Sequence, residues 1–192
     1  MQKHSHKYFI VFVTAVVMMF GFAQRSQAQQ LGLKLNALMW AAGTPSVGME
    51  VVLGQRSSLD LSAFGHYKPY TFDSKLIAFQ PEYRYWFNGR PFTREFIGAT
   101  IMVADYDITT RSYVYDGNAV SAGITGGYSF LLNKRWRLEL CGGFSFLYFR
   151  QKKYYVHDNY DDYFVGTPVK ANSWGYKLFP AKLGVTFTYI IK

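Results

Sequence analysis

Apolar and polar side chains alternate one by one along most of the chain after residue 30. In the stretch LGLKLNALMW, at residues 31–40, Leu31, Leu33 and Leu35 occupy every second position. A period of two places successive side chains on opposite faces of a β-strand, so the pattern predicts strands with one apolar and one polar face. We expect eight strands and an all-β fold. The predicted strands are residues 31–40, 47–53, 57–67, 76–87, 96–103, 120–131, 136–149 and 173–191.

The first 28 residues have a different pattern, which is that of a secretory signal peptide. Lys3 and Lys7 precede an apolar run at residues 8–23, and Ser26 and Ala28 supply the small residues of a cleavage site. A transmembrane helix needs about 20 apolar residues, and this run is shorter. We expect residues 1–28 to be removed and residues 29–192 to form one exported domain.

The connections between the predicted strands are of two kinds. The short or turn-rich ones are residues 54–56, 88–95 and 132–135, and the long ones, full of Tyr, Asp and Lys, are 68–75, 104–119 and 150–172. The phrase LGQRSSLDLSAFG, which contains the first short turn, returns as LNKRWRLELCGGF around the last. Short turns on one side and long loops on the other are typical of bacterial outer-membrane barrels. We predict an eight-stranded antiparallel up-and-down transmembrane β-barrel.

The polar faces of the predicted strands carry small residues and every mid-strand charge. Acids and bases balance there, and an enclosed interior tolerates charges only when they are paired. We therefore predict a structural network of charges in the lumen of the barrel. Its members are Lys34, Glu50, Asp60, Glu82, Arg84, Arg137, Glu139 and Lys182.

Two kinds of barrel fit these strands, and they differ in where the apolar face points. A soluble lipocalin-like carrier turns the apolar face inward around an apolar ligand, whereas a membrane barrel turns it outward to lipid. Small residues on the polar face suit a narrow lumen. Aromatic residues, among them Trp86, Trp136 and Trp174, gather near strand ends, as they do at membrane interfaces. Both features favour the outer membrane, and the soluble carrier stays an alternative.

Several stretches resemble a known family. They are LKLNALMWAAGTPSVGMEVVLGQRSSLDLSAF, FQPEYRYWF, LNKRWRLEL and the terminal PAKLGVTFTYIIK. Together they are similar to an uncharacterised bacteroidete family of small outer-membrane β-barrels, domain of unknown function family 3575. The resemblance covers nearly all of residues 29–192, implies an outer-membrane location, and implies no activity.

Few residues suggest chemistry. His66 could act as a base in a lipid-modifying barrel enzyme, but a lone histidine without a paired serine and acid is usually structural. The acidic run at residues 157–162 lacks the spacing of a calcium loop, and Cys141 fits a small interior filler. We expect no catalytic residue, no cofactor and no metal site.

The longest predicted loop, residues 150–172, is the candidate partner-binding segment. Tyrosine supplies rigid contact area with a polar tip, and neighbouring charges can orient a partner. The aromatic residues of the segment are Tyr154, Tyr155, Tyr160, Tyr163 and Phe164. An alternative is that strands simply extend here as a hairpin whose aromatic rings pack on one another.

Charge also points to partners. Most of the basic excess falls on the predicted periplasmic turns, which suggests contact with anionic lipid headgroups or with an acidic periplasmic protein. The sequence pI of about 9.5 is only a weak indication of nucleic acid, and no nucleic-acid motif accompanies it. We expect a non-enzymatic barrel that presents loops at the cell surface, with a structural, adhesive or envelope and surface-fibre assembly role. A lipid-modifying enzyme is the alternative.

Overall fold

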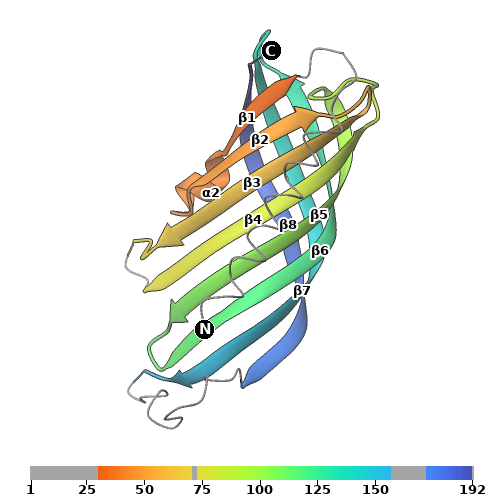
Figure 1. The fold of residues 1–192 in the computed structure, drawn as a ribbon. Coiled ribbons are helices and arrows are strands. Elements are labelled where there is room, and N and C mark those ends of the chain that lie inside the picture. Colours follow the sequence, from red (N-terminus) through yellow and green to blue (C-terminus); the bar gives the residue numbers. More distant parts are fainter. Residues whose placement is uncertain (1–29, 71–72, 157–171, 192) are drawn as a thin grey trace, which may run out of the picture.

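The computed structural model describes residues 30–70, 73–156 and 172–191. These residues form strands, one short helix and the connections between them (Figure 1). The predicted signal peptide lies outside the described residues. The elements are β1 (Leu31–Asn36), α2 (Ala37–Ala41), β2 (Ser46–Val52), β3 (Ser57–Tyr67), β4 (Ser74–Trp86), β5 (Arg94–Thr109), β6 (Tyr113–Leu131), β7 (Trp136–Tyr155) and β8 (Ser173–Ile190).

The eight strands are antiparallel and close into a hydrogen-bonded ring. Each strand pairs with its neighbours in the sequence, and β1 also pairs with β8. The ladder that closes the ring joins residues 32–36 to residues 186–190. The prediction of an all-β fold with eight antiparallel strands is confirmed.

The ring has two ends with different connections. At the short-turn end, residues 53–56, 87–93 and 132–135 join successive strands. At the hairpin end lie α2, the β3–β4 connection, the β5–β6 turn at residues 110–112 and the ends of β7 and β8. In Figure 1 the short-turn end is at the top and the hairpin end at the bottom.

Strand length rises steeply around the ring. β1 and β2 have 6 and 7 residues, whereas β6 and β7 have 19 and 20. The prediction of a long loop at residues 104–119 is therefore wrong, because β5 and β6 extend into it and only residues 110–112 turn. Residues 150–155 likewise continue β7. Polar side chains suggested loops here, but backbone pairing between antiparallel strands continues whatever their polarity.

The first predicted strand is too long. It was expected to run to residue 40, but β1 ends at Asn36, whose Oδ1 accepts a hydrogen bond from the Met39 backbone N–H (3.3 Å) and so caps α2. Asparagine is a favoured helix N-cap because its side chain satisfies a free backbone N–H of the first turn. The Trp40 indole then donates to the Ser46 carbonyl (2.8 Å), which holds α2 beside the start of β2.

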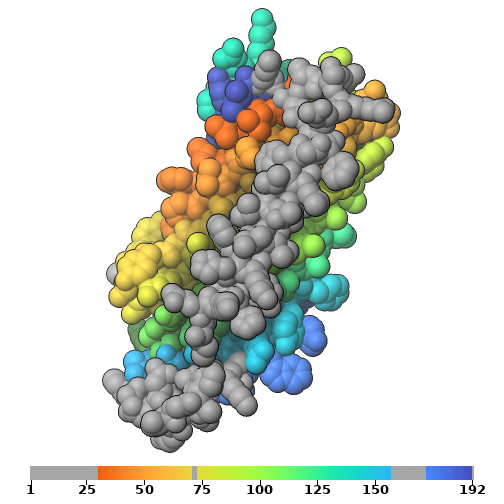
Figure 2. Space-filling view, in the orientation of Figure 1, coloured from red at the N-terminus to blue at the C-terminus, as the bar shows by residue number. Residues whose placement is uncertain are grey.

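The outer face of the ring is apolar. Val47, Ile77 and Phe146 are 60%, 69% and 73% exposed, and they alternate with buried residues of the interior. Trp86 does not join the aromatic residues of the outer face, as had been predicted, but is fully buried in the ring. Figure 2 shows one long flank of this elongated molecule, with side chains from the start of β8 (blue) projecting near the hairpin end. In the described part of the chain, no helix is long and apolar enough to span a bilayer.

Candidate functional site

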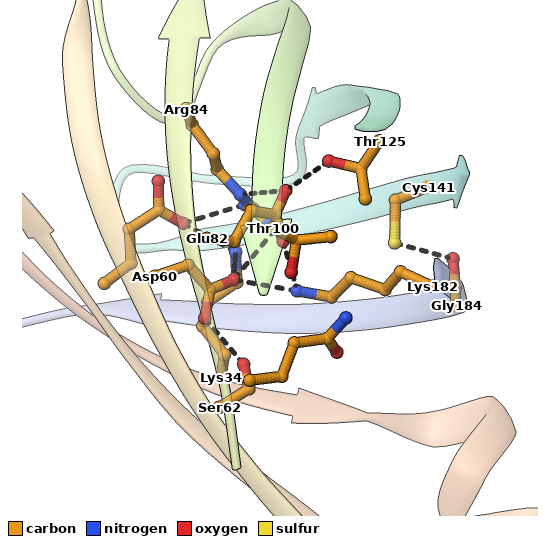
Figure 3. A network of polar contacts seen from close by, with 12 residues as sticks. Lys34, Asp60, Ser62, Glu82, Arg84, Thr100, Thr125, Cys141, Lys182 and Gly184 are labelled. Carbon is orange, nitrogen blue, oxygen red and sulfur yellow. Dashed lines mark hydrogen bonds and ion pairs between the residues drawn. The ribbon is translucent and has the colours of Figure 1, made fainter. Parts of the chain in front are cut away.

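A network of buried charges crosses the interior of the ring. Seven of the eight residues predicted for it come together, and Figure 3 labels Lys34, Asp60, Glu82, Arg84 and Lys182 among them. They arise from β1, β2, β3, β4, β7 and β8, and alternation along each strand turns them inward. The seven are Lys34, Glu50, Asp60, Glu82, Arg84, Glu139 and Lys182.

Arg84 is the centre of the network. Its guanidinium contacts all four carboxylates, at 2.9 Å from Glu50, 2.8 Å from Asp60, 3.0 Å from Glu82 and 3.0 Å from Glu139. Only the planar, five-donor geometry of arginine can serve so many acceptors at once. The Arg84 guanidinium also lies over the Phe96 ring, with its Cζ 4.4 Å from the ring centroid.

Two lysines complete the pairing. The Lys34 ammonium lies 2.6 Å from both Glu50 and Glu139, and the Lys182 ammonium lies 2.7 Å from Glu82 and 3.1 Å from Asp60. Hydroxyl groups occupy further carboxylate positions. Ser58 donates to Glu50, Ser62 to Asp60, Thr125 to Glu82 and Thr188 to Glu139.

The network is not neutral. Its three bases face four acids, so its formal charge is −1. Arg137, the eighth predicted member, lies instead at the short-turn end, where its guanidinium donates to the carbonyls of Phe92 (3.2 Å) and Asn133 (2.6 Å). The predicted balance of four against four is therefore wrong, because the Arg137 guanidinium donates to backbone carbonyls at the short-turn end and not to the carboxylates.

Aromatic residues close the ring between the network and the short-turn end. Trp86 and Phe96 pack with centroids 4.9 Å apart, and Phe92 lies 6.2 Å from Trp86. Phe92 is fully buried although it belongs to the β4–β5 connection, and its carbonyl accepts hydrogen bonds from Ser129 and Arg137. This connection thus folds into the ring as a plug. The sequence did not reveal it, since a turn has no periodicity to show which way its residues point.

A cavity of about 320 Å³ lies on the other side of the network, toward the hairpin end. Lys34, Asp60 and Lys182 form its polar floor. Its walls are largely apolar. They include Met39, Phe64, Leu76, Met102, Phe179 and Ala181. Sequence reasoning missed this cavity, because alternation tells which residues face inward but not whether they fill the space.

His66 has hydroxyl partners on both ring nitrogens. Its Nδ1 lies 2.9 Å from Thr44 Oγ1, and its Nε2 lies 3.1 Å from Ser74 Oγ. The sequence offered no serine partner for this histidine, since Ser74 was assigned to a loop. No acid is among the hydrogen-bond partners of His66 in the described part of the chain.

Neither cysteine nor metal chemistry stands out in the interior. Cys141 is buried beside Trp86 and Phe96, and its thiol points to the Gly184 carbonyl at 3.7 Å. Of the residues the structure describes, no group of three or more His, Cys, Asp or Glu is arranged to hold a metal ion.

The hairpin end carries aromatic and basic side chains on long strands. Tyr113 and Tyr155 pack with centroids 4.6 Å apart and share a hydrogen bond of 3.0 Å, while the Lys153 ammonium lies over the Tyr113 ring at 4.5 Å. Tyr154 and Tyr155 thus belong to β7 rather than to a loop. The other predicted partner-binding residues, at 160, 163 and 164, lie outside the described residues.

The short-turn end is basic, as its sequence indicates. Its connections and adjoining strand ends expose five bases against one acid. These bases are Arg56, Arg90, Arg94, Lys134 and Arg135, and the acid is Glu95.

Comparison with known proteins gives one match. No curated protein matches the chain, and no solved structure matches it. A family model matches residues 11–191, nearly the whole sequence, and its description reads "Protein of unknown function (DUF3575)". The chain belongs to the DUF3575 family.

Proposed function

We propose that this protein is a transmembrane β-barrel of the bacterial outer membrane, without enzymatic activity, which presents its hairpin end at the cell surface. The observation that carries the proposal is the direction of the two faces. Large apolar side chains cover the outside of a closed ring, and charges occupy the inside. Lipid favours this arrangement, whereas a soluble lipocalin-like carrier would require the reverse.

Backbone chemistry supports the same placement. Lipid offers no partner for a free N–H or C=O group, so sheets in membranes close into barrels. The ring of this protein closes through the β1–β8 ladder. Its interior charges are compensated by one another and by hydroxyl groups, so burial in a narrow lumen leaves no carboxylate unpaired.

Strand length supports a surface role for one end. About 9–11 residues take a tilted strand across a bilayer, and β6 and β7 are about twice that length. Their ends would project beyond the lipid as a stiff hairpin carrying Tyr113, Lys153 and Tyr155. Such a platform suits a structural, adhesive or surface-fibre assembly role, with an envelope or surface protein as partner. The basic short-turn end would then face the periplasm and the anionic headgroups of the inner leaflet.

The membrane placement is tested by arginine placed at two depths of the wall. Ile101 of β5 faces outward at 54% exposure, and Val114 of β6, beside the β5–β6 turn, lies on the same strand face as the outward residues Val120 and Ile124. Arginine at the bilayer midplane of a barrel costs about 2–4 kcal/mol, and near or beyond the interface about 0–1 kcal/mol. We expect Ile101→Arg, but not Val114→Arg, to lower the temperature at which the folded band is lost in unboiled gel electrophoresis. Equal effects of the two substitutions, or a monomer soluble without detergent, would end the proposal.

The surface role is tested by shortening the hairpin. Removing residues 155–167 and joining the ends with glycines leaves the β7–β8 ladder intact and removes only the last β6–β7 pair, Tyr113 with Tyr155. The shortened protein should still show heat-modifiable migration but should lose the partners captured by cross-linking in intact cells. Capture of the same partners would place recognition elsewhere, with the β5–β6 hairpin as the next candidate.

The second candidate function is a lipid-modifying barrel enzyme. The contact of His66 with Ser74 favours it, since a base beside a hydroxyl is the minimum of a nucleophilic pair. A deletion strain complemented with Ser74→Ala should keep the lipid acyl profile of the parent strain if the protein is not an enzyme. A profile that follows the Ser74 and His66 variants would favour catalysis.

A further inference from the structure

The ladder that closes the ring covers only part of β8. Pairing between β1 and β8 ends at Asn36 and Thr186, whereas pairing between β7 and β8 continues to Ser173. Along residues 173–185 of β8, no described strand pairs with the edge that faces β1. The helix α2 lies against β8 in this region. The Asn36 amide donates to the Leu183 carbonyl (3.3 Å) where the ladder stops.

The wall of the ring is therefore incomplete where residues 173–185 of β8 have no described strand partner on the side of β1, a place that we call the seam. β1, with 6 residues, is shorter than the 9–11 residues that cross a bilayer. Open strand edges often contain a proline or a bulge, which prevents pairing with another strand. The strand β8 has both. The register shifts between Gly143 and Phe144 on β7, opposite Pro180 and Lys182, so that Ala181 is the additional residue.

The cavity reaches this seam. Besides its interior walls it is lined by Val47 and Leu183, which face outward and are 60% and 64% exposed. They flank the end of β1 on β2 and β8. Lining by both inward and outward residues indicates that the cavity approaches the surface here, beside Met39 of α2.

One polar atom in the cavity has no hydrogen-bond partner among the residues that the structure describes. Thr186 is 4% exposed and lines the cavity. Its Oγ1 is buried without a hydrogen bond to any described residue. A buried hydroxyl left unpaired costs about 1–3 kcal/mol, so a ligand atom that accepts a hydrogen bond from Thr186 would offset this cost.

Charge restricts the ligand further. The ammonium groups of the floor, Lys34 and Lys182, are already paired with carboxylates at 2.6–2.7 Å. Because the network has a formal charge of −1, another anion beside it would be repelled. The polar group that enters should be an uncharged acceptor, such as an ester oxygen.

We propose that the unpaired edge of β8, beside α2, is a lateral portal, through which one acyl chain of an uncharged acyl ester passes from the surrounding lipid into the cavity. The acyl chain lies between Phe64, Met102 and Phe179, and the ester oxygen accepts a hydrogen bond from the Thr186 hydroxyl. A volume near 320 Å³ is at the small end of the range of about 300–1,000 Å³ for ligand pockets, which suits a single chain. The inference rests on the proposed membrane placement.

The test uses radiolabelled methyl stearate and stearic acid as probes. The full chain is purified in a steroid detergent, which has no alkyl chain to compete, and bound label is measured after gel filtration at alkaline pH, where stearic acid is ionised. Methyl stearate should be retained, and the acid should bind at least about tenfold more weakly, a difference of about 1.4 kcal/mol. Equal retention of the two probes would overturn the charge argument.

Variants separate the cavity from the outer surface. Ala181→Phe fills the cavity and should abolish retention, whereas Ala99→Phe makes the same change on the outer face of β5 and should not. Thr186→Val should weaken retention by roughly fivefold, the worth of about one hydrogen bond, and Thr186→Ser should restore it. Because the valine removes no hydrogen bond within the described protein, this variant remains informative if Ala181→Phe fails to fold.

The outcomes distinguish the two proposals. A chain that migrates as a heat-modifiable membrane protein but retains neither probe overturns the portal and leaves the membrane placement intact. A chain that retains methyl stearate yet stays monomeric in water without detergent overturns both the membrane placement and lateral access. Retention unaffected by Ala181→Phe or by Thr186→Val overturns the portal.

Discussion

At the short-turn end the interior of the ring is filled, whereas toward the hairpin end it is hollow. The filled half holds the charge network and, nearer the short turns, the packed rings of Trp86, Phe92 and Phe96. The hollow half begins at the ammonium groups of Lys34 and Lys182 and ends among apolar side chains. The same closed sheet thus surrounds both a rigid core and a cavity.

The difference shows how stability and binding can be separated in a ring whose apolar side chains face outward and whose charges face inward. When the outer face is apolar, the usual hydrophobic core is unavailable to the interior, and packing must come from paired charges and a few buried rings. Because one half of the interior supplies that stability, the other half can contain a cavity without loss of the fold. We therefore expect substitutions in the filled half to change folding and substitutions in the hollow half to change binding.

The largest effect should come from Arg84→Met. It would leave four carboxylates facing two ammonium groups, and losing one partner of a buried ion pair already costs about 3–5 kcal/mol. We expect a loss near or above about 5 kcal/mol, measured as unfolding in urea by tryptophan fluorescence in detergent micelles. Arg135→Met is the control, since the Arg135 guanidinium is exposed and donates a hydrogen bond to the Tyr189 hydroxyl at the surface. Similar losses for the two variants would show that the network does not stabilise the ring.

The same substitution in both halves tests the comparison directly. Phe96→Ala removes a buried ring that contacts Trp86 and Arg84, and should cost about 3–4 kcal/mol. Phe64→Ala removes a partly exposed cavity wall and should cost about 1 kcal/mol. Unfolding in urea compares the two variants. A cost for Phe64 as large as that for Phe96 would mean that the cavity half is also a core.

Glu82→Gln should have a smaller effect than loss of Arg84. It leaves three bases against three acids, so the network becomes neutral, and the amide oxygen can still accept from Thr125. We expect a loss of about 2 kcal/mol from weaker contacts with Arg84 and Lys182. Glu82→Leu removes the hydrogen bonds as well and should cost about 3–5 kcal/mol. Equal losses would indicate that charge alone, and not hydrogen bonding, fixes Glu82.

Tyr155→Phe should have the smallest effect. It removes an exposed hydrogen bond with Tyr113 at the tip of the hairpin but keeps the ring contact. We expect a change of at most about 0.5 kcal/mol in unfolding. A large loss of stability would mean that the hairpin end is part of the folding core.

Alternation was sufficient to predict which side chains face the interior. Glu50, Asp60, Glu82 and Arg84 lie on β2, β3 and β4 in the middle of the strands, where a period of two leaves no choice of face. Trp86 shares the inward parity of Glu82 and Arg84, so register alone could have placed it inside.

Other features depend on contacts that a strand period does not encode. The start of α2 continues the alternation of β1, and only the Asn36 cap reveals the helix. The burial of Phe92 depends on the path of a turn. The position of the Arg137 guanidinium depends on the backbone carbonyl that this turn presents to it. The cavity depends on volume, which sequence pattern does not measure.

The short β1–β8 ladder also has a kinetic consequence. The hairpins β5–β6 and β6–β7 join residues close in sequence, and such local pairs form early. The ladder between residues 32–36 and 186–190 joins opposite ends of the described chain, so its loop-closure entropy is the largest in the sheet. We expect the ring to close last, by a brief search between its first and last strands. If the protein inserts into a membrane as proposed, an open, nearly complete sheet would be the species that first contacts lipid.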